Sequence, residues 1–175
     1  MEYVITIIQD ANSLKPNFDF QAIEECMNYV EDINRPEILN LQQVKSLRSL
    51  HADLRVSIAD LDRCANMFES SSHEFDIQFV EQTVARCEQP NFLNSSFTCD
   101  DYVFVKGRLD HAKSIVDDVE AIFRGGPNYN YESMSPLKNE IDEYPYMSLL
   151  DECVAFNNLF NKVNAISAKL ESLAT

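Results

Sequence analysis

Apolar residues recur at alternating three- and four-residue intervals along the chain, which is the spacing of one face of an α-helix. The first such seam follows Pro36 and is predicted to end near Glu69, before a cluster of serines. Its positions are Val44, Leu47, His51, Leu54, Ile58, Leu61, Ala65 and Phe68. The pattern predicts a long helix that starts after Pro36, runs to about Glu69 and packs lengthwise against other helices.

Two further seams follow, and each predicts another long helix. The second helix is expected over residues 101–124, before Gly125-Gly126-Pro127, and the third over residues 147–173. The second seam comprises Val105, Leu109, Ala112, Val116, Val119 and Phe123, and the third comprises Leu149, Cys153, Phe156, Phe160, Val163, Ser167 and Leu170. Since each long helix then has partners within the same chain, the seams favour a monomeric array over a dimeric coiled coil.

Shorter helices are expected in the intervals between breakers. They are predicted over residues 2–12, from an N-cap at Asp19 to residue 33, from Phe75 to the residues before Pro90, and from Ser135-Pro136 to Tyr144. The predicted fold is all-α, a multi-helix bundle or array of about seven helices in which short and long antiparallel helices alternate. Residues 1–175 would form one helical domain, with sub-units 1–72, 73–126 and 127–175.

An internal repeat is one explanation of this alternation. The segment Asp19–Glu24 aligns with Asp76–Glu81, with identical Asp, Gln and Glu, and Val44-Lys45 aligns with Val105-Lys106. Any two amphipathic helices share some of this spacing, so a genuine repeat and a coincidence both stay open.

The composition is acidic, with 14 Lys and Arg against 29 Asp and Glu and a net charge of -15. This charge opposes binding to nucleic acid or to an anionic membrane, and no apolar run is long enough to span a bilayer. Protein partners are therefore expected. The acids are dispersed, so they either solvate the outer helix faces or favour a basic partner such as a histone tail.

The cysteines, five in number and widely separated without a Cys-x-x-Cys pair, indicate reduced thiols in an intracellular protein, nuclear or cytoplasmic. His51, His73 and His111 lie far apart and show no metal-ligand spacing. No catalytic or phosphate-binding motif is present. We therefore expect no catalytic residues, no cofactor, no metal and no enzymatic activity.

Four tyrosines, Tyr129, Tyr131, Tyr144 and Tyr146, surround the last short helix. Tyrosine is favoured at protein interfaces because it buries a large ring and keeps a polar tip, so these residues are candidates for binding a partner. The alternative is that the rings pack over the end of the bundle.

The alternation of short helix, breaker-rich loop and long helix resembles the helical linker repeats of JARID-type histone lysine demethylases. The similar segments are Phe20–Cys26 followed by Leu39–Leu61, and Phe79–Glu81 followed by Tyr102–Ile122. The chain departs from that family in having no Trp, and it carries none of the iron ligands or zinc-finger cysteines of the catalytic part. The resemblance implies a non-catalytic spacer and docking segment.

The expected function is thus a helical scaffold or protein-protein interaction module, with a place in a chromatin-modifying complex. The alternative is a self-contained bundle of viral or signalling type that binds a partner helix in an apolar groove.

Overall fold

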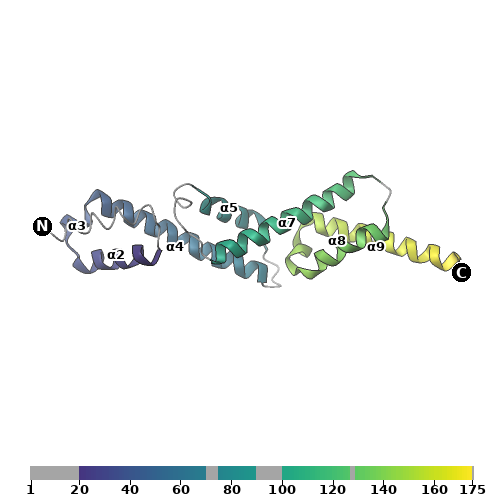
Figure 1. Cartoon of the computed structure of the whole chain (residues 1–175), viewed down its shortest axis with the longest axis horizontal. Coiled ribbons are helices and arrows are strands. Elements are labelled where there is room, and N and C mark those ends of the chain that lie inside the picture. Colours follow the sequence, from purple (N-terminus) through teal and green to yellow (C-terminus); the bar gives the residue numbers. More distant parts are fainter. Residues whose placement is uncertain (1–19, 70–74, 90–99, 127–128, 175) are drawn as a thin grey trace. The chain divides into compact units, whose positions relative to one another are not determined.

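The structure, a computed structural model, describes residues 20–69, 75–89, 100–126 and 129–174 (Figure 1). Their elements are α2 (Phe20–Ile33), α3 (Pro36–Leu39), α4 (Gln42–Glu69), α5 (Ile77–Cys87), α7 (Asp100–Arg124), α8 (Tyr131–Glu143), the 3₁₀-helix η1 (Pro145–Leu149) and α9 (Asp151–Ala174). These ranges contain helices and no strand, which confirms the all-α prediction. The helix predicted over residues 2–12, and also His73, lie outside the described residues.

The contacts divide the chain into two compact units. Unit 1 comprises Met1–Cys64 and Gln78–Phe104, and unit 2 comprises Ala65–Ile77 and Val105–Thr175. Both α4 and α7 therefore contribute residues to each unit. The sub-units 1–72, 73–126 and 127–175, which follow the sequence pattern, stay a prediction.

In unit 1, α2 packs its apolar face against the first half of α4. Ile23 and Met27 of α2 form a buried cluster with Leu47 and Leu54 of α4. The helix ends where Asn34 takes a left-handed conformation with φ 45°, which asparagine tolerates better than most residues. The short helix predicted to end at residue 33 is thus confirmed, whereas its predicted N-cap, Asp19, lies outside the described residues.

The long helix expected after Pro36 is broken, and this prediction was wrong at its start. Pro36–Leu39 forms the separate helix α3, and α4 begins only at Gln42. Between them the Leu41 N–H donates to the Ile38 carbonyl at 3.0 Å, which tightens the backbone. Ile38 and Val44 share one buried cluster with Val30. Residues six apart in a continuous helix point about 120° away from each other, so the break lets both side chains reach that cluster.

The helix expected to enter at Ser135-Pro136 begins one turn earlier, at Tyr131. The Asn130 side chain accepts a hydrogen bond from the Glu132 backbone N–H at 2.9 Å, so it supplies an N-cap ahead of the proline. Pro136 then lies inside α8. The correction arises because the cap at Asn130 starts the helix before the proline is reached.

The last long helix also begins later than predicted, at Asp151 instead of Met147. Residues 145–149 form η1, in which the Met147 N–H donates to the Tyr144 carbonyl at 3.0 Å. Asp151 and Glu152 then occupy the first turn of α9, where the helix dipole favours negative charge.

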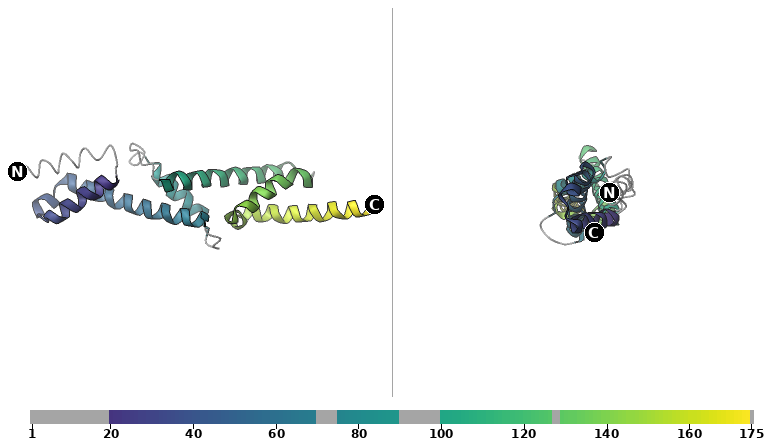
Figure 2. Two further views of the ribbon diagram at one scale, coloured as in Figure 1. Left: turned by 60° about the horizontal axis from the view of Figure 1, so that its bottom comes forward. Right: turned by 90° about the vertical axis from the view of Figure 1, so that its left-hand side faces the viewer.

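The core of unit 2 is rich in aromatic rings. Phe68 and Tyr146 are almost fully buried and meet edge to face, with centroids 4.9 Å apart. Phe75 lies 5.1 Å from the Tyr146 ring. α8 lies against the first half of α9 (Figure 2). The first residue of α8, Tyr131, contacts Phe160 with ring centroids 5.2 Å apart.

The first two seams are largely buried. Leu47, Leu54 and Leu61 are fully buried, whereas Ile58 and Ala65 are half-buried. Ser57 and Cys64 are buried as well, because α4 contacts both α2 and α5 and so buries a wider face than a narrow seam. The second seam is buried at Val105, Leu109, Ala112 and Val119, with Ile115 in addition, whereas Phe123 is 38% exposed.

Candidate interaction surface

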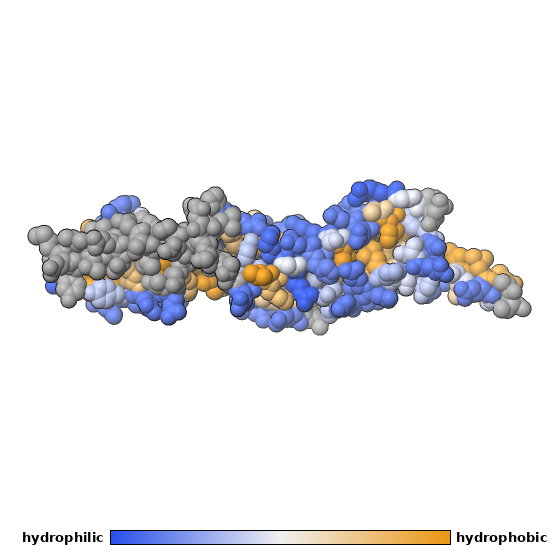
Figure 3. All heavy atoms as spheres, in the orientation of Figure 1, coloured by the Kyte–Doolittle hydropathy of each residue, from blue (hydrophilic) through white to orange (hydrophobic). Residues whose placement is uncertain are grey.

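The third seam is buried along the first half of α9 and less buried along the second, where Val163 and Ser167 are half-buried and Leu170 is exposed. Cys153, Phe156 and Phe160 are buried. Beyond them three large apolar side chains face solvent: Ile166 is 59% exposed, Leu170 62% and Leu173 83%. Figure 3 shows hydrophobic atoms at the surface of this end of α9.

These exposed residues continue a half-buried row on the same helix. Leu159 and Val163 are half-buried, and together with the three exposed residues they follow the intervals four, three, four and three. At 3.6 residues per turn this spacing places all five on one face. We call this face the distal strip: Leu159, Val163, Ile166, Leu170 and Leu173.

The sequence predicted that Leu170 packs within the chain, and this prediction was wrong. The reason is the difference in length between α8 and α9, which contain 13 and 24 residues. At 1.5 Å per residue these helices are about 20 and 36 Å long. α8 contacts Phe160 through its first residue, Tyr131, so it covers only the first half of α9. Ile166 and Leu173 were missed, although their helical spacing was visible.

Two lysines border the distal strip. Lys162 and Lys169 each precede a strip residue, Val163 and Leu170, and both lysines are exposed. They are seven residues apart, so they lie on the same edge of the strip. With Glu171 as the only acid after residue 160, this end of the chain carries a net charge of +1 in a chain of net charge -15.

The long helices hold short helices through ion pairs as well as apolar contacts. In unit 1, Glu31 of α2 lies 4.0 Å from Arg48 of α4, and Glu24 lies 3.9 Å from His51. In unit 2, Glu140 of α8 lies 3.0 Å from His111 of α7. Both of these short helices therefore turn carboxylates toward cationic or protonatable groups on the long helix.

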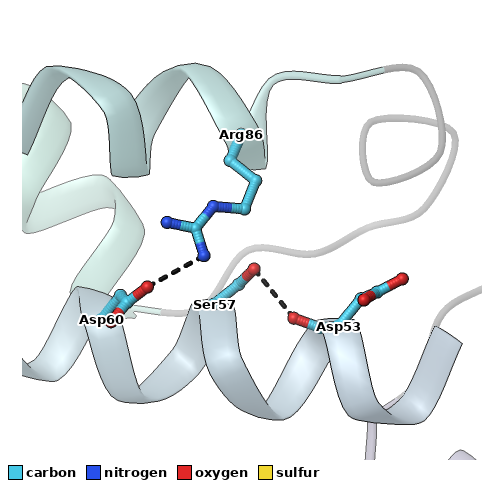
Figure 4. A network of polar contacts seen from close by, with 4 residues as sticks. All are labelled: Asp53, Ser57, Asp60 and Arg86. Carbon is cyan, nitrogen blue, oxygen red and sulfur yellow. Dashed lines mark hydrogen bonds and ion pairs between the residues drawn. The ribbon is translucent and has the colours of Figure 1, made fainter. Parts of the chain in front are cut away.

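In the contact between α5 and α4 the charges are reversed: the short helix carries the cation and the long helix carries the carboxylate. Arg86 of α5 donates to Asp60 of α4 at 2.9 Å, one turn beyond the buried Ser57 (Figure 4). The Ser57 hydroxyl donates to the Asp53 carbonyl at 2.9 Å, so its hydrogen bond is made inside α4. Arg63 of α4 also lies over the Phe79 ring of α5, 4.7 Å from its centroid. α4 thus holds α2 along one half and α5 along the other.

The four tyrosines singled out from the sequence are not equally accessible. Tyr146 is 2% exposed and belongs to the core of unit 2. Tyr144 packs under Arg108, 4.9 Å from the guanidinium, while Tyr129 is half-buried. Tyr131 is 36% exposed and its ring lies against Phe160 of α9. A role in partner binding stays a prediction for all four.

Two potentially reactive side chains of the described residues, His51 and Cys153, are embedded in the helical packing. His51 is half-buried and stacks on Phe20 with centroids 5.8 Å apart. Burial, with a smaller contribution from Glu152, raises the pKa of the Cys153 thiol to about 11. That thiol therefore stays protonated at neutral pH and packs as a small apolar group. The described ranges contain no group of three or more His, Cys, Asp or Glu side chains that could hold a metal ion.

Among the described residues, no helix combines the length and apolar character needed to span a membrane. Comparison with known proteins identifies no relative, because no family model, no curated protein and no solved structure matches the chain.

Proposed function

We propose that this chain is a non-enzymatic helical interaction module that binds a protein partner along the distal strip of α9. The observation that carries the proposal is the exposure of Ile166, Leu170 and Leu173 on one face of a helix whose first half is well packed. Contiguous exposed apolar surface bordered by polar residues is typical of protein interaction sites. The resemblance to demethylase linker repeats would place such a module in a chromatin-modifying complex, and that assignment is part of the proposal.

The strip can contribute a useful but limited binding energy. Complete burial of a Leu or Ile side chain is worth about 1.5 to 3 kcal/mol. Weighted by the exposed fractions of the three side chains, the strip offers roughly 3 to 6 kcal/mol before the cost of association. A stable complex therefore requires further contacts, which the polar border of the strip can provide.

The proposal is tested by affinity capture from extracts of cells that produce the protein. The strip variant is Ile166→Glu with Leu170→Glu, and the matched control is Val56→Glu, at an α4 position that is 53% exposed and outside the strip. Wild type and the control should capture the same partner in near-stoichiometric amounts, whereas the strip variant should lose at least about tenfold, since a buried unpaired carboxylate is strongly disfavoured. Capture of chaperones alone, or of the same partner by all three proteins, contradicts the proposal.

A further inference from the structure

We infer that the element bound by the distal strip is a short amphipathic helix whose apolar face has an acidic edge, of the kind that α2 represents within this chain. The inference rests on the proposed function and specifies the chemistry of the partner.

Elsewhere in the chain, a long helix is covered by short helices along its length. α4 holds two short helices, α2 through the cluster around Leu47 and Leu54 and α5 through the pair formed by Asp60 and Arg86. α9 holds α8 along its first half, and the contact of Tyr131 with Phe160 marks the end of that coverage. The distal half of α9 therefore corresponds in position to the half of α4 that holds α5, but its border residues Lys162 and Lys169 are basic, as Arg48 is on the half of α4 that holds α2.

The apolar faces of the short helices match the strip in spacing. The buried residues of the short helices follow the same three- and four-residue intervals as the strip: Ile23, Met27 and Val30 in α2, Val80, Val84 and Cys87 in α5, and Met134, Leu137 and Ile141 in α8. A helix of this type presents an apolar row two to three turns long. The exposed part of the strip, from Ile166 to Leu173, has the same length.

The charges beside the strip favour an acidic partner helix. Glu24 and Glu31 of α2 are seven residues apart and border its apolar face, where they approach His51 and Arg48 of α4. Lys162 and Lys169 are also seven residues apart along the edge of the strip. A partner helix with carboxylates seven residues apart can place one near each lysine, because residues at this spacing lie on the same edge of a helix. Opposite charges at the rim of an interface select the partner and its register.

The experiment uses a fluorescein-labelled peptide with the sequence of residues 20–33, carrying Cys26→Ser, and measures its anisotropy against the intact chain. The acidic peptide should bind wild type and the control variant Lys45→Glu, which changes an exposed lysine on α4, with the same affinity. The variant with Lys162→Glu and Lys169→Glu should bind at least about tenfold more weakly. A peptide that also carries Glu24→Lys and Glu31→Lys should show the reverse preference, so that binding to the double variant is restored.

This charge exchange separates specific pairing from general attraction. The chain has a net charge of -15, so general attraction would make the charge-exchanged peptide, with a net charge of 0 against -4 for the acidic peptide, the better ligand of wild type. That result overturns the inference, as does an acidic peptide that shows no saturable binding up to about 1 mM. A dimer of the chain in sedimentation analysis that dissociates on Leu170→Glu also overturns it, because the occupant is then a second copy. Each of these results overturns only the nature of the partner. The proposed function would still be supported if the strip variant lost partner capture in the affinity experiment.

Discussion

Replacing one buried and one exposed leucine tests how α9 differs from the other long helices. Leu109 of α7 and Leu170 of α9 both lie on predicted seams and both belong to unit 2. Leu109 is 3% exposed and Leu170 is 62% exposed. The two substitutions Leu109→Ala and Leu170→Ala remove the same atoms from the same unit, so any difference in effect reports the difference in packing.

The expected magnitudes follow from the buried fractions. Leu→Ala removes three carbon groups, worth about 2.4 kcal/mol at about 0.8 kcal/mol each when fully buried. A residual cavity adds to this, so Leu109→Ala should lower the free energy of unfolding by about 2.5 to 5 kcal/mol. At Leu170 just over a third of the side chain is buried, and alanine has a slightly higher helix propensity than leucine. Leu170→Ala should therefore cost about 0.5 to 1 kcal/mol.

The measurement is urea-induced unfolding followed by far-UV circular dichroism, with both variants compared with wild type at one protein concentration. The dependence of the unfolding free energy on urea concentration should be the same in both variants as in wild type, so that the change in the midpoint reports stability. Equal losses for the two substitutions would refute the reasoning, because Leu170 would then be as well packed within the chain as Leu109.

Three further predictions concern positions outside the strip. Gly107→Ala should raise the free energy of unfolding by about 0.5 to 1 kcal/mol in the same assay, because Gly107 is helical and exposed and nothing lies within 4 Å of an added Cβ; a loss of stability contradicts this. A double-mutant cycle on Arg86 and Asp60, which meet at 2.9 Å, should give a coupling of about 0.5 to 1 kcal/mol that decreases with salt, and zero coupling would show that the contact does not stabilise unit 1. Burial raises the pKa of Cys153 from 9.0 to about 11, so the folded chain holds this proton more tightly than the unfolded chain. The contribution of this protonated thiol to the free energy of unfolding should be fully present below pH 9 and fall by on the order of 2 kcal/mol as the pH rises to about 11. Cys153→Ala should remove that part of the pH dependence.

Periodicity was sufficient to predict that the described part of the chain is helical and to place much of its core. Leu54 and Leu61 are buried where the three- and four-residue intervals place them, because one face of an amphipathic helix must leave water. The end of α7 was also predicted, from the sequence Gly125-Gly126-Pro127. In the structure Gly126 has a φ of +85°, a conformation that glycine adopts without strain.

Helix starts were predicted less well, because they depend on local hydrogen bonds and on neighbouring clusters. The long helix was predicted to start after Pro36, but the shared burial of Ile38 and Val44 requires a break after α3. Pro136 was interpreted as the first turn of α8, but Asn130 caps the helix one turn earlier. In both places proline was the stronger local signal and a contact made by another residue decided the boundary.

The candidate site could be predicted only in part. Val163 and Leu170 were recognised as seam residues, but apolar spacing does not tell how far a neighbouring helix extends along the seam. The short length of α8 decides that Leu170 is exposed. The role of Lys162 and Lys169 follows only after the strip they border is known.

Hydrogen exchange of the α9 backbone, measured by mass spectrometry on the intact chain, tests the central claim most directly. Residues 151–160 carry the buried Cys153, Phe156 and Phe160, whereas residues 161–174 carry the exposed part of the strip. The account predicts strong protection of the first segment and weak protection of the second, with the second slowed at least about tenfold by the acidic peptide of residues 20–33. Equal protection of the two segments in the chain alone would contradict it, because the distal half of α9 would then already be packed.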